Sequence, residues 1–152
     1  ILSKFPLHKG INYDISEYRF ERRGLLHSTI ELEGQKTIHC FCVHLALLQR
    51  GRERQLTTIL HHIEHLSGNH PTIIAGDFND WRNTISKPMG QAGFVDVFES
   101  LYGAPARTFP SIRPILPMDR IYVRGLVIQK AEILTEWAKL SDHLAIYAEL
   151  GH

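Results

Sequence analysis

The sequence predicts an α/β fold, and three consecutive segments near the middle of the chain carry that prediction. Lys36 to Leu45 predicts a strand that is apolar on both faces, and Arg50 to Leu66 repeats apolar side chains at helical spacing. After Gly68 ends the helix, Thr72 to Ala75 forms a short apolar run that is typical of a buried strand. A strand, a helix and a second strand in succession form the unit of a layered α/β domain.

The composition is that of one globular domain. The chain has 152 residues, of which 43% are hydrophobic and 22% are charged, and its formal net charge is +1. So small a charge argues against a strongly basic nucleic-acid-binding surface, although it leaves room for a local basic cleft. No apolar run approaches the roughly 18 residues of a membrane span, and the first residues lack a secretory signal pattern.

The two cysteines bear on the cellular compartment. Cys40 and Cys42 are two residues apart on one predicted strand, so their side chains point the same way and cannot readily form a disulfide with each other. Two free thiols fit a reducing compartment, and we therefore expect a cytoplasmic protein.

The N-terminal third is expected to contain an antiparallel hairpin. Ile1 to Leu7 has the character of a strand, whereas residues 8–20 lack periodicity and predict a loop or an irregular edge segment. Leu25 to Leu32 predicts a strand, and a turn at Glu33 to Gln35 joins it to the strand Lys36 to Leu45.

The second strand of this hairpin and the helix that follows it are expected to differ in how many of their faces are buried. Both faces of the strand are largely apolar, so we expect it to be buried on two sides, with His44 at its end. The helix has one apolar stripe, and we expect His61 and His65 to lie on its solvated face. The stripe consists of Leu56, Ile59, Leu60, Ile63 and Leu66.

The rest of the chain continues with short elements. Residues 84–102 predict two helical pieces separated by Gly93, with Phe94, Val97, Phe98 and Leu101 in the core. Four prolines between Pro105 and Pro117 then mark a long loop, where substrate-binding residues tend to lie. The last three predicted strands are Met118 to Val123, Leu126 to Leu134 and Leu144 to Leu150.

Side chains capable of chemistry stand at the boundaries of several predicted strands. They are His44, Asp77 with Asn79, Asp119, and Asp142 with His143. Each has a structural alternative: Gly76 to Asp80 can form an Asx turn that closes a strand, and Asp119 can pair with Arg120. Charged groups at the ends of apolar strands are costly unless they are paired or used, so their shared position favours an active site.

Three segments resemble the C-terminal motifs of the endonuclease/exonuclease/phosphatase superfamily, whose fold is also called DNase I-like. They are Ile74-Ala75-Gly76-Asp77-Phe78-Asn79, Met118-Asp119-Arg120-Ile121-Tyr122-Val123 and Ser141-Asp142-His143-Leu144. Their order agrees with the family, as does the strand end at Val43-His44-Leu45, and Arg107-Thr108-Phe109-Pro110 recurs in small bacterial members. Ile1 to Leu7 also resembles the mid-chain strand of the family.

The resemblance implies a metal-dependent phosphoester hydrolase of phosphodiesterase or nuclease type, with Mg²⁺ or Mn²⁺ as cofactor. It implies a four-layer α/β sandwich of two packed, mixed and mostly antiparallel sheets. By the same resemblance Asp77 would activate the attacking water, and the amide of Asn79 would hold water, metal or phosphate oxygen. His143, kept cationic by Asp119, would stabilise charge on the phosphoryl oxygens.

The remaining roles also follow from the resemblance. Asp142 would bind the metal, because hard cations prefer oxygen ligands, and His44 would contact the scissile phosphate. Arg107, Phe109 and Arg120 are the expected substrate-binding residues.

The resemblance covers nearly the whole chain but only the C-terminal part of the family's domain. The family's upstream metal-binding Glu and first-strand Asn would precede Ile1. We therefore expect residues 1–152 to form a single incomplete domain that lacks its N-terminal part and is inactive or impaired alone. Its exposed sheet edges would favour self-association.

The motifs leave the substrate open among nucleic acid, a phospholipid head group and a small phosphodiester. A function of another class also stands: a non-catalytic truncated module that acts in self-association or partner binding. This non-catalytic module predicts no metal dependence. Among the substrates of the hydrolase, binding that weakens steeply with salt would favour nucleic acid over a small substrate.

Overall fold

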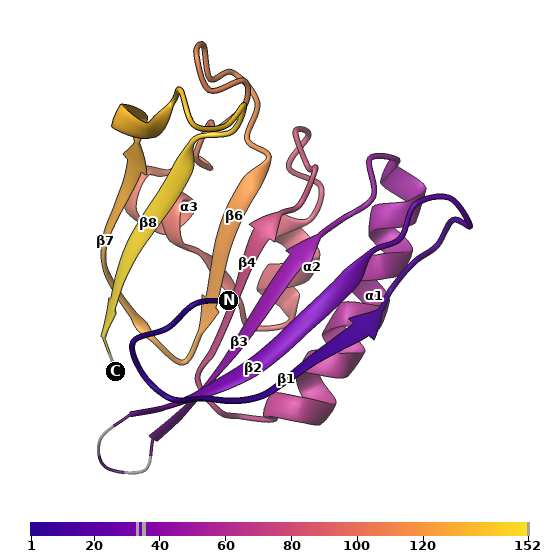
Figure 1. Cartoon of the computed structure of the whole chain (residues 1–152), viewed down its shortest axis with the longest axis vertical. Helices are drawn as coiled ribbons and strands as arrows, with labels where there is room; N and C mark the ends of the chain where they lie inside the picture. The colour runs from indigo at the N-terminus through magenta and orange to yellow at the C-terminus, as the bar shows by residue number, and fades with distance from the viewer. Residues whose placement is uncertain (33, 35, 152) are drawn as a thin grey trace.

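Two β-sheets organise the chain, which a computed structural model describes over residues 1–32, 34 and 36–151 (Figure 1). The larger sheet has six strands in the order β1-β2-β3-β4-β6-β5. They are β1 (Leu7–Asp14), β2 (Gly24–Leu32), β3 (Lys36–His44), β4 (Thr72–Asp77), β5 (Val95–Asp96) and β6 (Asp119–Arg124). The smaller sheet pairs β7 (Val127–Leu134) with β8 (Ala145–Gly151).

The strand directions confirm the expected mixed α/β fold with mostly antiparallel sheets. Among the described strands, β3 and β4 are parallel and every other pair is antiparallel. The parallel pair is the strand–helix–strand unit read from the sequence, because α1 (Gln49–Ser67) connects its two strands. The other helices are α2 (Ser86–Gln91), α3 (Val97–Tyr102) and a 3₁₀ helix at Thr135–Trp137.

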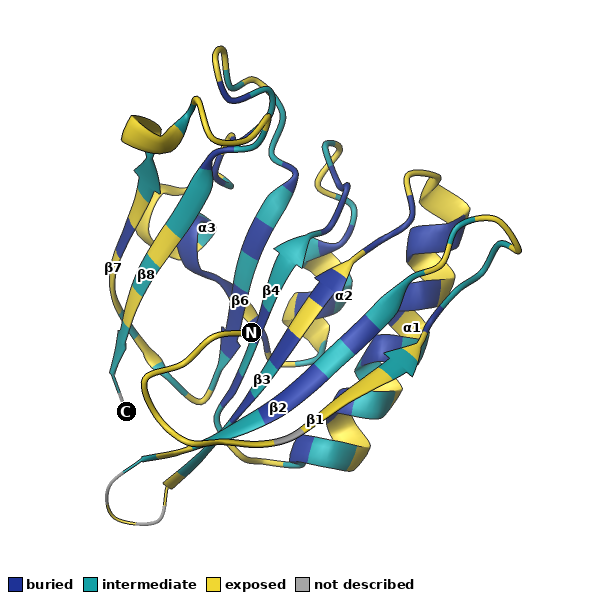
Figure 2. Cartoon of the chain, viewed as in Figure 1, coloured by how far each residue is buried: buried dark blue, intermediate teal, exposed yellow. Residues whose placement is uncertain are grey.

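The main core lies between the larger sheet and its helices. Figure 1 shows α1 and α2 behind this sheet, and Figure 2 shows the buried stripe of α1 turned toward it. Ile59 and Ile63 pack there with Phe41 of β3 and Ile74 of β4, as the helical spacing predicted. His61 and His65 are exposed, as expected. No helix within the described residues is both long and apolar enough to cross a membrane.

A second core attaches the smaller sheet. Val97 and Phe98 of α3 are buried with Val123 of β6 and Ala131 of β7, and Ile146 of β8 packs against the same cluster. The two short helices on either side of Gly93 are confirmed, but Leu101 is exposed rather than in the core. It lies on the outer side of α3, because a helix this short turns only part of its circumference toward its neighbours.

The N-terminal strand is placed differently from the prediction. Residues 1–6 are irregular, and the strand is β1, which begins at Leu7 and pairs with β2 at the edge of the sheet. The register shift between His8 and Ile11 and the solvated outer face explain why its sequence shows no clear alternation. The hairpin of β2 and β3 is confirmed, whereas Glu33 and Gln35 of its predicted turn lie outside the described residues.

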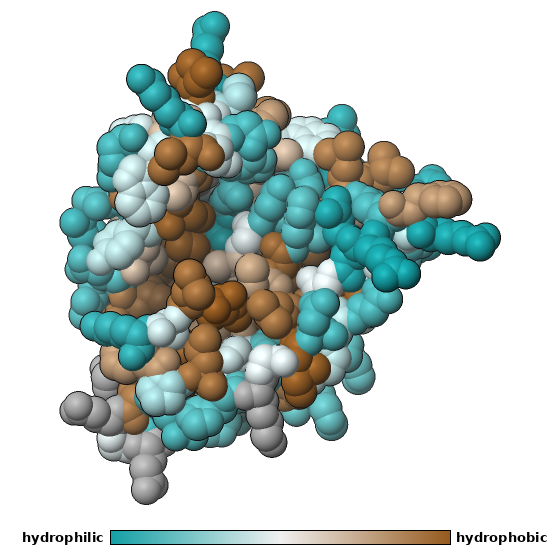
Figure 3. All heavy atoms as spheres, viewed as in Figure 1, coloured by the Kyte–Doolittle hydropathy of each residue, from teal (hydrophilic) through white to brown (hydrophobic). Residues whose placement is uncertain are grey.

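The expectation that β3 is buried on two sides is wrong. Phe41 and Val43 are buried beneath α1, but Cys42, which points to the other face, is exposed. Figure 3 shows hydrophobic side chains gathered in the middle of this other face, which the smaller sheet covers only in part. This face of β3 is therefore partly open to solvent although its side chains are largely apolar.

Five loops meet at one edge of the larger sheet, and this edge positions the candidate site. Strands β1, β3 and β4 end there, while β2 and β6 begin there. The side-chain contact between Asp119 of β6 and His143, which lies in the β7–β8 connection, brings this connection to the same edge. The loops span residues 15–23, 45–48, 78–85, 103–118 and 135–144. Figure 1 shows them along the top and the upper right of the view.

Candidate active site

Three neighbouring strands place acidic and imidazole side chains side by side at this edge. His44 of β3 pairs in register with Asp77 of β4, and Asp77 pairs in register with Asp119 of β6. His44 Nε2 lies 3.4 Å from Asp77 Oδ2, and His143 Nδ1 lies 2.7 Å from Asp119 Oδ2. The structure thus brings together four residues that are spread over a hundred positions in the sequence.

Gly76 allows β4 to deliver Asp77 to this position. Its φ of 145° is one that side chains rarely adopt, and a Cβ atom there would lie 2.0 Å from the carbonyl oxygen of Val43. The close approach is therefore to the backbone of β3 rather than to a ligand. It holds the ends of β3 and β4 together directly beside the acidic residue.

The Asp77 carboxylate is partly removed from water. Burial raises the pKa of Asp77, as does the charge of Asp119, while the backbone N–H of Asn79 and the charges of His44 and His143 oppose the rise. Asp77 Oδ1 accepts that N–H bond at 2.8 Å, which leaves Oδ2 toward His44. A carboxylate with a raised pKa beside imidazoles is suited to accept a proton.

Asn79 has a structural contact that the sequence did not suggest. Its side chain is only 5% exposed, and its Nδ2 donates a hydrogen bond of 2.9 Å to the carbonyl oxygen of Leu45. Its φ of 51° is left-handed, as in a tight turn. Asn79 thus ties the loop after β4 to the loop after β3, so its amide nitrogen is engaged within the protein.

Asp119 holds two partners at one oxygen. Its Oδ2 accepts a hydrogen bond from the hydroxyl of Thr108 at 2.5 Å and is also the atom nearest His143. Burial lowers the pKa of His143, but the hydrogen bond and charge of Asp119, with the charges of Asp77 and Asp142, outweigh burial and raise this pKa above its ordinary 6.5. The surroundings of His143 therefore favour the cationic form of its ring more than water does.

The three expected substrate-binding residues separate in the structure. Phe109 packs on His143 with their ring centroids 4.9 Å apart, so it borders the cluster. Arg107 is exposed and lines a different cavity, of about 560 Å³, between α3 and β7. Arg120 is only 1% exposed, so its expected contact with substrate is wrong.

Arg120 instead holds the loop that follows Asp77. Its guanidinium donates to Asp96 Oδ2 at 3.3 Å, to the carbonyl oxygen of Asp80 at 3.3 Å and to Asn83 Oδ1 at 3.2 Å. A buried cation with these partners fixes the start of α3 relative to the loop after β4.

Asp142, the expected metal ligand, is exposed next to His143. Its Oδ1 lies 3.4 Å from the hydroxyl of Ser141, and its carboxylate borders an apolar cavity rather than the Asp77 carboxylate. Across residues 1–32, 34 and 36–151, no three His, Cys, Asp or Glu side chains lie close enough together to hold a metal ion.

Thr108 is the residue of the cluster that sequence reasoning missed. It is fully buried, and besides its bond to Asp119 its hydroxyl accepts a hydrogen bond of 3.3 Å from the Asp119 backbone N–H. Its position between Arg107 and Phe109, in a segment already singled out, was the available signal. In a sequence, a threonine between an arginine and a phenylalanine does not by itself indicate a role in an active site.

Comparisons with known proteins agree on the family. A family model described as "Endonuclease/Exonuclease/phosphatase family" matches residues 1–143. The uncharacterized protein YbhP of Escherichia coli K12 is 39% identical over 155 residues, which cover 99% of this chain and 61% of YbhP. YbhP of Shigella flexneri matches to the same extent. The chain thus spans about three fifths of the length of these relatives.

Solved structures show the same fold at lower identity. A functionally unknown conserved protein from Enterococcus faecalis has a TM-score of 0.79 at 24% identity, and the match covers 95% of this chain and 67% of that one. An endonuclease/exonuclease/phosphatase from Bacteroides vulgatus has a TM-score of 0.76 at 19% identity, covering 95% and 65%. D. rerio TDP2, complexed with a single-strand DNA product, has a TM-score of 0.77 at 20% identity, covering 96% and 69%.

Proposed function

The chain belongs to the endonuclease/exonuclease/phosphatase family, and we propose that the protein carrying it hydrolyses phosphoesters by metal-dependent attack of water at phosphorus. The observation that carries the proposal is the His143–Asp119 pair, bonded at 2.7 Å, whose Asp119 pairs in register with Asp77 on the neighbouring strand. A base and a cationic donor beside each other are what in-line displacement at a phosphate requires.

Each member of the cluster has a distinct role in this proposal. Asp77 takes the proton of the attacking water, since its raised pKa makes it a better proton acceptor than an ordinary aspartate. Cationic His143 stabilises the charge that grows on the phosphoryl oxygens, and Asp119 orients its ring and holds its proton. His44, exposed next to Asp77, donates to the phosphate from the other side.

The metal site is part of the proposal. Asp142 offers an exposed carboxylate, a donor of the kind that Mg²⁺ and Mn²⁺ prefer, but it is a single ligand. A bound divalent ion would neutralise phosphate charge and polarise the phosphoryl group. Because the described residues bring no larger ligand set together, the proposal places the remaining ligands in the part of the relatives' length that this chain does not span.

The test is turnover of bis(4-nitrophenyl) phosphate by the whole protein that carries these 152 residues, with Mg²⁺, with Mn²⁺ and with EDTA. We expect Asp77→Ala or His143→Gln to lower kcat by a factor of about 10² to 10⁴. His65→Gln, on the exposed face of α1, is the matched control and should leave kcat unchanged. Turnover that survives Asp77→Ala or EDTA contradicts the proposal, and robust turnover by the 152-residue chain alone contradicts the placement of the missing ligands.

A second candidate function rests on the open face and edge of the larger sheet. β1 is an edge strand with Leu7 and Ile11 exposed, and Cys42 is exposed on the adjoining face. Such surfaces favour self-association or binding of a partner without catalysis. Light scattering of the 152-residue chain over a range of concentrations distinguishes a monomer from an oligomer. A monomer at all concentrations rules out self-association.

A further inference from the structure

We propose that the edge bearing the site is also a membrane-docking rim, so that the phosphoester hydrolysed is the head group of a phospholipid in an anionic bilayer. This inference rests on the proposed hydrolase function. It starts from the side chains on the five loops that surround Asp77 and His143, which the catalytic cluster does not use.

The loop tips expose large apolar side chains. Phe20 is 98% exposed, Ile112 is 91% exposed and Leu140 is 81% exposed, and each belongs to a different loop. Such exposure is unfavourable in water but becomes favourable when the side chain enters the interface of a bilayer. Together with four further exposed side chains on the same edge, the docking rim consists of Phe20, Leu47, Leu48, Ile112, Ile115, Trp137 and Leu140.

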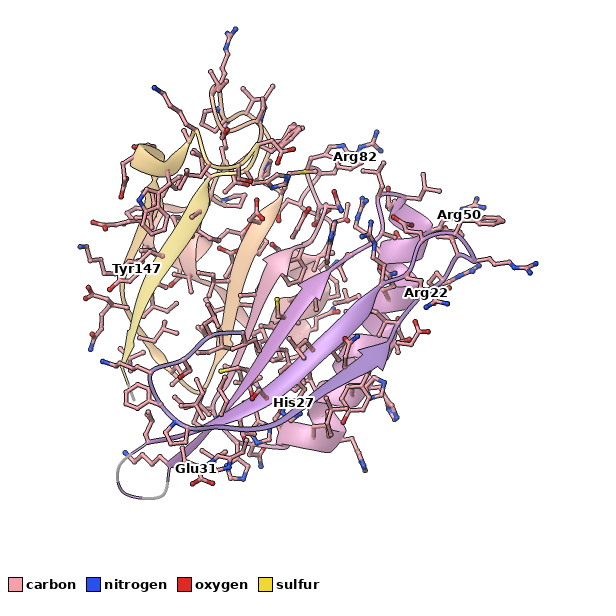
Figure 4. All side chains as sticks on the ribbon, viewed as in Figure 1. Arg22, His27, Glu31, Arg50, Arg82 and Tyr147 are labelled. Carbon is pink, nitrogen blue, oxygen red and sulfur yellow. The ribbon has the colours of Figure 1, made fainter. Side chains whose placement is uncertain are left out.

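Cations lie among these apolar tips. Arg82, Arg50 and Arg22 are spread along the upper right side of the molecule, where these loops lie, whereas Glu31 lies at the bottom of the view (Figure 4). The exposed cations of the edge are Arg19, Arg22, Arg50, Arg82, Arg113 and Lys139. The exposed carboxylates of the edge, counted over the same loops and the element ends next to them, are Asp14, Glu53, Glu136 and Asp142.

Two further carboxylates of the edge are already paired. Glu21 lies 2.6 Å from Arg23, and Glu17 lies 3.5 Å from Arg54. Exposed cations therefore outnumber exposed carboxylates at this edge, in a chain whose formal net charge is only +1. Apolar tips interleaved with cations match the surface of an anionic bilayer, where head groups attract the cations and the acyl region accepts the tips.

An apolar cavity lies beside the docking rim and is lined in part by the residues on either side of His143, Asp142 and Leu144. It has a volume of about 740 Å³ and lies between the two loops that carry Ile112 and Leu140. Pro110, Pro114 and Leu144 line it, and Leu144 directly follows His143. A substrate whose phosphate reaches His143 can place an adjoining apolar group there, as a phospholipid can.

The chemistry of the tips favours lipid over nucleic acid. Five of the seven docking-rim side chains are aliphatic, and an aliphatic side chain offers no flat face on which a base can stack. Proteins that bind single strands rely instead on aromatic platforms in a strongly basic groove. Here the aromatic members are Phe20 and Trp137, and an exposed Trp is also typical of a membrane interface.

The first experiment measures vesicle binding by the whole protein. Sedimentation with vesicles of equal parts phosphatidylcholine and phosphatidylglycerol is compared with phosphatidylcholine alone, and we expect at least about tenfold stronger binding to the anionic vesicles. The double variant Phe20→Ser/Leu140→Ser should weaken binding by about tenfold or more. Val127→Ser, which removes a 60% exposed apolar side chain at the opposite end of the sheet, is the matched control and should not weaken it.

The second experiment compares turnover of phosphatidylglycerol vesicles with turnover of bis(4-nitrophenyl) phosphate. We expect Phe20→Ser/Leu140→Ser to lower the ratio of vesicle to soluble turnover, with an unchanged melting temperature as evidence of folding. If neither substrate is turned over, the proposed function fails. If the soluble substrate is turned over but vesicles are not bound, or if an oligothymidylate is bound more tightly than anionic vesicles, the inference of a lipid substrate is overturned.

Discussion

Thr108 and His143 bind the same carboxylate oxygen, Oδ2 of Asp119, from opposite segments of the chain. The hydroxyl restrains the carboxylate and competes with the imidazole for that oxygen. We predict that Thr108→Val, which keeps the side-chain volume, lowers kcat about tenfold and moves the alkaline side of the pH–rate profile upward, because Oδ2 then interacts with His143 alone.

Thr108→Ser is the control for this positioning role, because it restores the hydroxyl and should recover most of kcat. A purely structural Thr108 would lower stability in the Val variant without moving the pH–rate profile. That outcome, read from the profile and a thermal melt together, contradicts the prediction.

The pH–rate profile should be bell-shaped, with both sides displaced toward higher pH. Burial raises the pKa of Asp77 above its ordinary 3.8, so activity rises with pH later than it would for an exposed base. Asp119 raises the pKa of His143 above 6.5, so activity falls only when that proton is lost. His143→Gln should abolish the alkaline decline in kcat/KM, and a profile that keeps the decline contradicts the role of His143.

Asp77 should also lower the stability of the folded protein near neutral pH. The pKa of Asp77 is higher in the folded than in the unfolded chain. Protonated Asp77 is therefore favourable to the fold at low pH relative to ionised Asp77, and this contribution is lost as the pH rises through the folded pKa. We therefore predict that Asp77→Asn raises the free energy of unfolding at pH 7 by about 1 kcal/mol and makes no difference near pH 3. Urea unfolding at both pH values measures this, and a stability loss at pH 7 runs against it.

Much of the fold follows from the sequence because most elements carry a local pattern. The α1 stripe, the β2–β3 hairpin and the strand ends at His44 and Asp77 were predicted from periodicity and turn residues. β1 was not, because this edge strand is exposed over most of its length and has a register shift between His8 and Ile11, so no apolar alternation identifies it.

Arg120 shows why part of the site could not be predicted. Its neighbour Asp119 faces the cluster, and side chains alternate along a strand, so Arg120 must face the opposite side. Its buried partners Asp80 and Asp96 lie 40 and 24 residues away in the sequence, which no local pattern reveals. Thr108 was missed for the same reason, since its partner is 11 residues away.

Gly76→Ala should be among the most destabilising single substitutions in this chain. A Cβ atom 2.0 Å from the Val43 carbonyl oxygen, at a φ of 145°, forces β3 and β4 apart next to Asp77. We predict a loss of about 3 kcal/mol or more in the free energy of unfolding. Gly90→Ala is the matched control, because nothing lies within 4 Å of the position its Cβ would take. Equal stability of the two variants contradicts this account.

A pair of buried histidines should make the fold sensitive to acid. His27 Nε2 and His39 Nδ1 lie 3.0 Å apart beneath α1, with Phe41 stacked on His27 and His70 stacked on His39. Burial lowers the pKa of both histidines. The pKa of His39 falls to about 4, because the neighbouring imidazoles of His27 and His70 add to the effect of burial.

The unfolded chain therefore binds protons first as the pH falls below 6.5, and stability should fall between pH 6.5 and about 4. We predict a loss on the order of 1 to 2 kcal/mol from pH 8 to pH 5, measured by urea unfolding. The double variant His27→Leu/His39→Leu should be less sensitive to pH over this range, whereas His61→Gln on the exposed face of α1 should behave as the parent protein. If the double variant is as sensitive to acid as the parent protein, other titratable groups cause the sensitivity and the prediction is wrong.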